Sequence, residues 1–251
     1  MKSETIKSFE EQDPIIKLYN FCMNIGDFSI LKDISLDISF NDIVLLYGPR
    51  NSGKSSLLRS FVHLNEELYN NVEGKGGIFF EGKNVNELDR KYLRSQITYA
   101  DPTFVENLNI LTLNEILNLS LGLKITDISK EHYEILDKLG LSKKFSDLDN
   151  IKKHNSLKNW SIAEKISLIT FISLARNPKV FMFDSILDHL DDFLLKDVKE
   201  ILYQIKKDRT LIISTRNLSL FSDIANKIIF IEDGKIQYNG TMDSFMLNFP
   251  R

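Results

Sequence analysis

Short, mainly apolar runs alternate with segments of helical spacing over much of the chain. The runs lie at residues 43–47, 180–183, 211–214 and 228–231. Apolar residues in between recur every three or four positions and predict helices over residues 161–176, 192–206 and 218–225. Because unbroken apolar runs are typical of strands buried on both faces, this alternation predicts an α/β fold with a largely parallel sheet.

A second strand pattern surrounds the first of these runs. Residues 15–40 contain short apolar segments interrupted by polar turns, which indicates an antiparallel strand layer. Residues 76–82 read as a glycine-bounded strand of the same layer, after a polar connection over residues 65–74. A strand over residues 96–100 is expected to stop at Asp101, because Pro102 follows it.

Strand patterns disappear between about residues 103 and 160. Apolar residues over 111–158 keep a helical spacing, and Thr112 and Ser129 are suitable helix N-caps. We therefore expect a helical lobe that is inserted into the α/β domain.

The composition is that of one large globular domain. The chain has 251 residues, of which 43% are hydrophobic and 27% charged, and the domain is expected over residues 14–251, after a polar segment at residues 1–13. A net charge of −3 provides no general positive field, so nucleic acid is not an expected partner. The single Cys22 excludes an internal disulfide. No run of about 18 apolar residues occurs, so no membrane span is expected.

The clearest motif follows the apolar run at residues 43–47. Residues 48–55 read GPRNSGKS, a full match to the pattern G-x-x-x-x-G-K-[ST], and a helical pattern comes next. Strand, glycine-containing loop and helix are the context in which this motif, the P-loop, cradles phosphate groups. The alternative is a turn that matches the pattern by chance.

Each residue type in this loop has a chemical reason. Gly48 and Gly53 permit a tight turn whose N–H groups face phosphate oxygens. The Lys54 ammonium would reach the β- and γ-phosphates of ATP, and the Ser55 hydroxyl would bind Mg²⁺. The expected nucleotide-binding residues of the loop are Gly48, Pro49, Arg50, Asn51, Ser52, Gly53, Lys54, Ser55 and Ser56.

Asp184 is the second expected magnesium ligand. It directly follows the apolar run at residues 180–183, and a carboxylate at the end of a neighbouring buried strand holds the metal beside a P-loop. The alternative is an aspartate that only caps the turn between strand and helix. ATP and Mg²⁺ are the cofactors that these motifs predict.

With its motifs in this order, the chain resembles the ATP-binding subunit of ABC transporters over about residues 15–249. The order comprises a strand layer, the P-loop, a helical lobe, Asn177-Pro178 before the strand that ends in Asp184, and a late strand. The resemblance implies the ABC ATPase fold: an α/β P-loop NTPase (RecA-like) core with an N-terminal antiparallel β layer and an inserted helical lobe. Within the family, the phosphate-importer ATPase is the most similar, judging by residues 26–28, 31–33, 57–61 and 64–66.

The resemblance also implies partners and a location. Subunits of this kind pair with a second copy or with another ATP-binding subunit. They bind membrane-spanning permease subunits and are peripheral proteins at the cytoplasmic face of the cell membrane. Closure of the two subunits around ATP would then drive the permease, and the transported solute would be chosen by other components.

Four departures from the family pattern lie on the hydrolytic side. The family's catalytic glutamate is replaced by Ser185, which cannot act as a base near neutral pH. The family histidine is Arg216, and the family glutamine falls at Asp101 or Pro102. Ser161 retains the serine of the L-S-G-G-Q signature, which would face the γ-phosphate held by a second subunit, but both signature glycines are replaced.

No catalytic residue of the family is therefore intact, and loss of a general base alone typically costs about 10² to 10⁴ in rate. We expect a subunit that binds MgATP and hydrolyses it very slowly. The alternative is a non-transport, ATP-dependent regulatory or scaffold protein of the same fold. A P-loop kinase is disfavoured, because no acceptor-binding motif stands out. Residues 188–192 (DHLDD) are expected to form the family's dimer-contacting D-loop rather than a metal cluster.

Overall fold

The computed structural model describes residues 13–146 and 156–249. The polar segment predicted at residues 1–13 thus lies outside the described residues except for Asp13, as does part of the predicted helical lobe. Within the described ranges, no helix has the length and apolar character needed to cross a bilayer.

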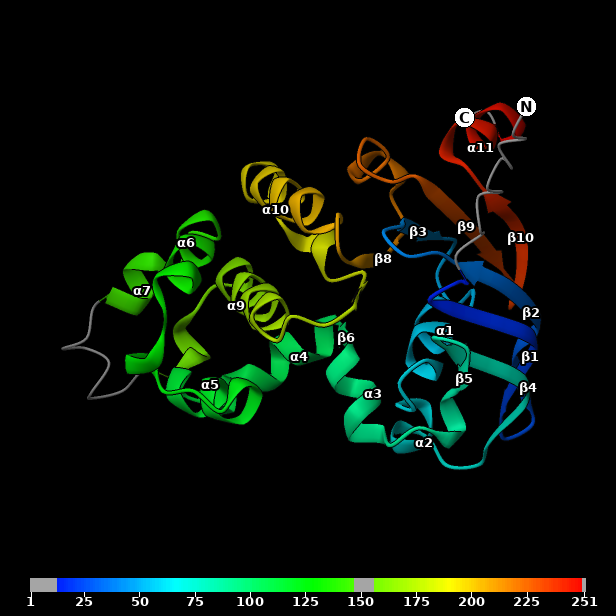
Figure 1. Ribbon diagram of the computed structural model, residues 1–251, viewed down its shortest axis with the longest axis horizontal. Coiled ribbons are helices and arrows are strands. Elements are labelled where there is room, and N and C mark those ends of the chain that lie inside the picture. The colour runs from blue at the N-terminus through cyan, green and yellow to red at the C-terminus, as the bar shows by residue number, and fades with distance from the viewer. Residues whose placement is uncertain (1–12, 147–155, 250–251) are drawn as a thin grey trace, which may run out of the picture.

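Two sheets form the body of the molecule (Figure 1). The smaller one is antiparallel, with its strands in the order β2-β1-β4-β5. It contains β1 (Ile16–Ile25), β2 (Phe28–Ile38), β4 (Val72–Phe80) and β5 (Lys83–Asn84). Buried residues such as Ile16 and Leu18 alternate with exposed ones, so one face of this sheet covers the core. The predicted antiparallel layer is confirmed.

The larger sheet has the strand order β10-β9-β3-β8-β7-β6 and is parallel except for the β9–β10 hairpin. Its strands are β3 (Ile43–Tyr47), β6 (Ile97–Ala100), β7 (Val180–Asp184), β8 (Thr210–Thr215), β9 (Lys227–Glu232) and β10 (Lys235–Gly240). Successive residues of β3 enter different cores: Ile43 and Leu45 one, Val44 and Leu46 the other. Burial on both faces explains the unbroken apolar runs and confirms the predicted α/β fold.

Helices cover both faces of the parallel sheet. Leu57 and Leu58 of α1 (Lys54–Ser60) share a core with the antiparallel sheet. On the other face lie α9 (Ile162–Ala175) and α10 (Asp192–Ile205), which contribute Ile166 and Val198 to the second core. The remaining helices near the sheets are α2 (Asn65–Leu68), α3 (Arg90–Gln96) and α11 (Met242–Asn248).

Between β6 and β7 the described chain is helical apart from an isolated bridge between Thr112 and Ser156. This part contains α4 (Pro102–Asn107), α5 (Leu113–Leu121), α6 (Lys130–Lys138) and α7 (Ser142–Ser146). Thr112 and Ser129 are the N-caps of α5 and α6, as predicted, and each takes part in a capping box. Figure 1 shows α5, α6 and α7 at the end of the molecule opposite the antiparallel sheet.

Short 3₁₀ segments connect many of these elements. They are η1 (Val85–Glu87), η2 (Leu108–Ile110), η3 (Ile125–Asp127), η4 (Leu157–Asn159), η5 (Leu187–His189) and η6 (Leu218–Leu220).

Two predictions about local structure were wrong. Residues 218–225 form η6 and turns instead of an α-helix, because the Asn217 side chain accepts from Ser219 N and the buried Phe221 draws the segment into the core. Residues 65–74 are not a plain polar connection, since they contain α2 and the start of β4. Here Asn65 is fully buried, and its amide group donates to Ser56 O.

Candidate functional site

The predicted P-loop connects the end of β3 to the start of α1. At Gly48 an added Cβ would lie 2.1 Å from Ile231 O, so no larger residue fits without moving the main chain. Gly53 has a φ of +105°, a conformation that other residues rarely adopt. Within the described chain, the main-chain amides of Asn51 and Ser55 donate no hydrogen bond. Unpaired amides around a tight loop are suited to binding an anion.

A cavity of about 710 Å³ lies over this loop. It gathers the predicted residues Arg50, Asn51, Ser52, Gly53, Lys54, Ser55, Ser56, Asp184, Ser185 and Arg216, together with Asp101 and Pro102. Gly48 and Pro49 are not in its lining, but both contact Lys54 through their carbonyl oxygens. Ser161 is not among the residues that line this cavity. The structure therefore brings together residues from the loop and from the ends of three strands.

Lys54 is buried and points back into its own loop. Its ammonium donates to Gly48 O at 2.8 Å, to Pro49 O at 2.7 Å and to Ser52 Oγ at 3.3 Å. Burial lowers the pKa of Lys54, and the nearby Asp184 carboxylate opposes this shift. The lysine is held at the mouth of the loop, where it can bind phosphate oxygens once these arrive.

Asp184 stands at the carboxyl edge of the parallel sheet, level with the start of the loop. Its register partner on β8 is Ser214, which in turn pairs with Leu46 of β3. Asp184 is buried, with 3% of its surface exposed. Oδ2 accepts a hydrogen bond from the Tyr99 hydroxyl at 2.9 Å, and Oδ1 has no partner in the described chain.

An unpaired, buried carboxylate oxygen is costly, because it loses its hydration without gaining a donor. A divalent cation in front of Oδ1 would remove this cost, and the Ser55 hydroxyl lines the same cavity. The residues present thus fit a Mg²⁺ ion, whose preferred ligands are oxygens. A role limited to capping the turn does not explain the unpaired oxygen.

Asp101, one of the two positions at which the family glutamine is expected, is a buried acid with several partners. Its carboxylate N-caps α4 by accepting from Thr103 N, and it pairs with the Arg59 guanidinium at 3.1 Å. Arg59 also donates to the Tyr99 hydroxyl at 3.0 Å. Burial and the neighbouring carboxylates raise the pKa of Tyr99, which keeps this phenol protonated.

Sequence reasoning missed Arg59 and Tyr99 as members of this site. Tyr99 is the one residue of β6 that is only partly buried, and Arg59 is the only cation in α1 after Lys54. These are weak signals in the sequence, because neither shows that the two side chains meet Asp184. His189 lines the cavity as well and was assigned only to the D-loop.

Ser185, at the position expected for the family base, carries a hydroxyl and not a carboxylate. Ser185 Oγ lies 3.4 Å from Ser214 Oγ, so two hydroxyl groups occupy this corner. Arg216 lines the cavity, and its main-chain N–H donates to Asp188 Oδ2 at 3.4 Å. Burial raises the pKa of Asp188. Within the described residues, no group of three or more His, Cys, Asp or Glu side chains is arranged to hold a metal, and this includes residues 188–192.

Ser161, which we expect to be the retained serine of the signature, is the N-cap of α9. Its hydroxyl accepts from Glu164 N at 3.2 Å, and the Glu164 carboxylate accepts from Ser161 N at 2.8 Å. Glu164 also pairs with Lys144 at 3.1 Å, and Lys144 lies over the Trp160 ring. The negative charge at Glu164 is thereby partly balanced within the chain.

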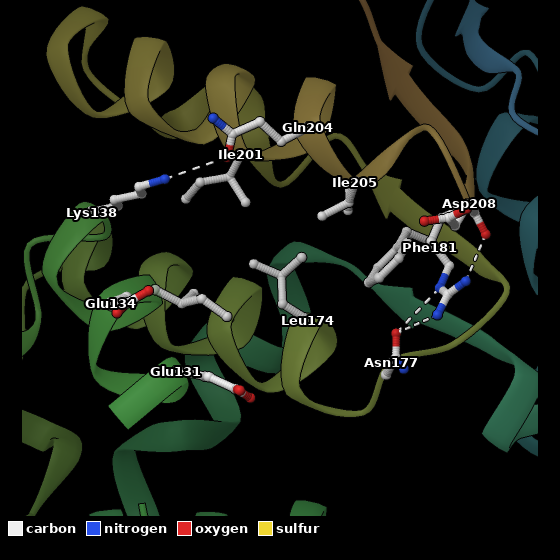
Figure 2. A pocket seen from close by; sticks show the side chains of 12 residues that line it. Glu131, Glu134, Lys138, Leu174, Asn177, Phe181, Ile201, Gln204, Ile205 and Asp208 are labelled. Carbon is white, nitrogen blue, oxygen red and sulfur yellow. Dashed lines mark hydrogen bonds between the residues drawn. The ribbon is translucent and has the colours of Figure 1, made fainter. Parts of the chain in front are cut away.

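A second cavity, of about 490 Å³, lies between α6, α9 and α10 (Figure 2). Leu174, Phe181 and Ile201 point into it, whereas Lys138 donates to Gln204 across its rim. Phe181 belongs to the amino-terminal half of β7, so this cavity is at the opposite end of the strand from Asp184. Ligands of open α/β sheets bind at the carboxyl ends of the strands, which favours the P-loop cavity as the functional site.

Comparisons with known proteins agree with this geometry. Residues 31–187 match the family model described as ABC transporter. The chain is 28% identical over 247 residues to the phosphate import ATP-binding protein PstB of Borreliella burgdorferi, covering 96% of this chain and 93% of that protein. It is 27% identical to the lantibiotic transport ATP-binding protein SrtF of Streptococcus pyogenes, with 90% and 93% covered. It is also 27% identical to the phosphonates import ATP-binding protein PhnC of Fusobacterium nucleatum, with 89% and 91% covered.

A solved structure has the same fold. A bacterial Atm1-family ABC exporter with ATP bound superposes with a TM-score of 0.75 at 19% identity, covering 94% of this chain. This chain spans 40% of the exporter chain. The family match covers more than half of the chain and the fold agrees with it, so this protein belongs to the ABC transporter family, as one of its ATP-binding subunits.

Proposed function

We propose that this chain is the ATP-binding subunit of an ABC importer, of the phosphate type, and that it couples ATP binding to transport through a membrane-spanning permease. One observation carries the nucleotide part of the proposal. The P-loop with its unpaired amides faces the same cavity as Asp184, whose Oδ1 is buried without a partner. Phosphates and Mg²⁺ complement these two features.

The loop and Lys54 would hold the phosphates, while Ser55 and Asp184 would hold the metal. When bound, Mg²⁺ neutralises charge on the β- and γ-phosphate oxygens. Arg216, which lines the same cavity, adds a permanent cation. Ser185 supplies no base, so we propose that hydrolysis is impaired and that binding is the main event at this site.

Exposed apolar side chains on the helical part support a permease partner. Ile110 is 86% exposed and Leu119 73% exposed. A permease subunit packed against this part of the chain would bury these two apolar side chains. The phosphate type rests on the PstB relatives, which match over nearly the whole chain. A partner subunit, either a second copy or another ATP-binding chain, would place Ser161 against the nucleotide of its neighbour.

MgATP binding and turnover by the purified chain, beside Lys54→Ala, test the nucleotide part. We expect Lys54-dependent binding and a turnover far below about 1 per second, a rate at the low end for enzymes. A Lys54-dependent turnover near 1 per second would contradict impaired hydrolysis. Absence of nucleotide binding would contradict the whole proposal.

A non-transport regulatory or scaffold protein of this fold is the second candidate, favoured by the loss of the family base at Ser185. Affinity purification of the tagged chain from detergent-solubilised membranes separates the two. Co-purification of a multi-span membrane protein is expected for the transporter subunit. Recovery of the chain from the soluble fraction without such a partner would favour the second candidate.

A further inference from the structure

The two oxygens of Asp184 are in different situations. Oδ1 is buried and unpaired, whereas Oδ2 accepts one hydrogen bond, from Tyr99 Oη. No other described residue donates to this carboxylate. The orientation of the carboxylate about its Cβ–Cγ bond therefore depends on the Tyr99 hydroxyl.

Tyr99 has a single proton and two carboxylates within reach. Its oxygen lies 2.9 Å from Asp184 Oδ2 and 3.0 Å from Asp101 Oδ2. Asp101 is already satisfied, because Oδ1 accepts from Thr103 N and Oδ2 pairs with Arg59. Asp184 has no other donor, so the tyrosine proton stabilises the site most when it is donated to Asp184.

Arg59 holds Tyr99 in place for this bond. The guanidinium donates to the tyrosine oxygen through Nε at 3.0 Å and to Asp101 through Nη2 at 3.1 Å. These two bonds fix the plane of a side chain that is largely buried. A hydroxyl group that accepts a hydrogen bond from a cation becomes a stronger hydrogen-bond donor, because consecutive hydrogen bonds polarise one another.

We infer that Tyr99 is a positioning residue for the metal: with Arg59 and Asp101 behind it, its hydroxyl holds Asp184 Oδ2 and so directs Oδ1 toward the Mg²⁺ that accompanies the nucleotide. This inference rests on the proposed function, because it assigns a role within the same nucleotide site. It names a partner of the metal ligand that no residue motif of the chain reveals.

The test measures how nucleotide binding depends on Mg²⁺. The full chain is mixed with a fixed concentration of the fluorescent analogue mant-ATP. Binding is measured first in EDTA and then at increasing concentrations of free Mg²⁺. Because the analogue concentration is fixed, the amount of Mg²⁺ complex that it forms in solution is the same for every variant. Loss of an outer-shell partner typically weakens metal binding about 10- to 100-fold. We expect Tyr99→Phe to raise the Mg²⁺ midpoint by about tenfold or more, while binding in EDTA stays that of the unaltered chain.

Tyr69→Phe is the matched control. Tyr69 lines the same cavity and accepts from Arg59 Nη1 at 3.3 Å, but it does not contact Asp184. Its loss should leave the Mg²⁺ midpoint unchanged. An equal midpoint for Tyr99→Phe and the unaltered chain would overturn the inference, as would equal shifts for the two tyrosine variants.

The two proposals fail in different ways. If the unaltered chain does not bind mant-ATP at any Mg²⁺ concentration, the proposed function fails. If it binds with a clear Mg²⁺ midpoint that Tyr99→Phe does not move, only the role of Tyr99 fails. Should Tyr99→Phe not fold, Arg59→Lys removes the bond from Nε but keeps the charge beside Asp101. A midpoint shifted upward supports the inference, and an unchanged midpoint overturns it.

Discussion

The two sides of the nucleotide cavity are built in different ways. One side is a continuous loop, residues 48–56, whose contribution depends mainly on main-chain amides and on two glycines. The other side consists of the single side chains Asp101, Asp184, Ser185 and Arg216, which come from the ends of the three strands β6, β7 and β8. On the resemblance described above, we expect the first side to keep the family pattern and the second to have lost most of it.

This difference shows why binding and hydrolysis can separate within one fold. Main-chain amides persist through many side-chain changes, provided that the glycines that shape the loop remain. A general base is one side chain, and a single substitution removes it. Drift can therefore remove catalysis position by position while the phosphate-binding loop stays intact.

Changing the loop itself should have the largest effect. In Gly48→Ala the new Cβ would lie 2.1 Å from Ile231 O, so the loop must move. If two hydrogen bonds from main-chain amides to the charged phosphates are lost, the binding free energy falls by about 3 kcal/mol or more. The affinity for mant-ATP should then fall about 100-fold or more.

Gly82→Ala is the control for this change. Gly82 also has a positive φ, of +73°, but nothing lies within 4 Å of an added Cβ. It should cost about 1 kcal/mol in the free energy of unfolding, measured in urea, and leave mant-ATP affinity unchanged. Equal affinities for the two alanine variants would show that the loop tolerates movement.

Restoring a base should have the next largest effect. In Ser185→Glu a carboxylate enters a corner that now holds two hydroxyl groups. We expect the Lys54-dependent turnover of MgATP to rise by about 10², the lower end for a general base, because Asp101 and Arg216 still differ from the family pattern. Ser185→Gln has the same shape without a base, and equal rates for Glu and Gln would show that the base is not what limits hydrolysis.

Removing the cap at the retained signature serine should have the smallest effect. In Ser161→Ala the N–H of Glu164 loses its acceptor, which typically costs about 1 kcal/mol in the free energy of unfolding. Ser129→Ala, at the equivalent capping box of α6, should cost a similar amount. Urea unfolding measures both. If Ser161 has a further role at a second subunit, only Ser161→Ala should also weaken nucleotide-dependent dimerisation, seen by gel filtration. Equal dimerisation by the two variants would contradict that role.

Local sequence patterns predicted much of the fold and, within the site, the loop and Asp184, but not Arg59 and Tyr99. The apolar runs identified β3, β7, β8 and β9 of the parallel sheet, because burial on both faces leaves few polar positions in such strands. The pattern failed for residues 218–225, which form η6 and turns instead of the predicted helix. Contacts of the Asn217 and Phe221 side chains determine their conformation, and apolar periodicity does not reveal such contacts.

The sequence by itself determined the phosphate-binding loop and the strand-end position of Asp184, because both depend on neighbouring residues and on the order of strand, loop and helix. Only the tertiary structure decided what surrounds that aspartate. Arg59, Tyr99 and Asp101 come from α1, from β6 and from the start of α4, and they meet because β6 packs beside β7 at one edge of the sheet. Such a hydrogen-bonded group depends on register between distant strands, and register is a property of the folded chain.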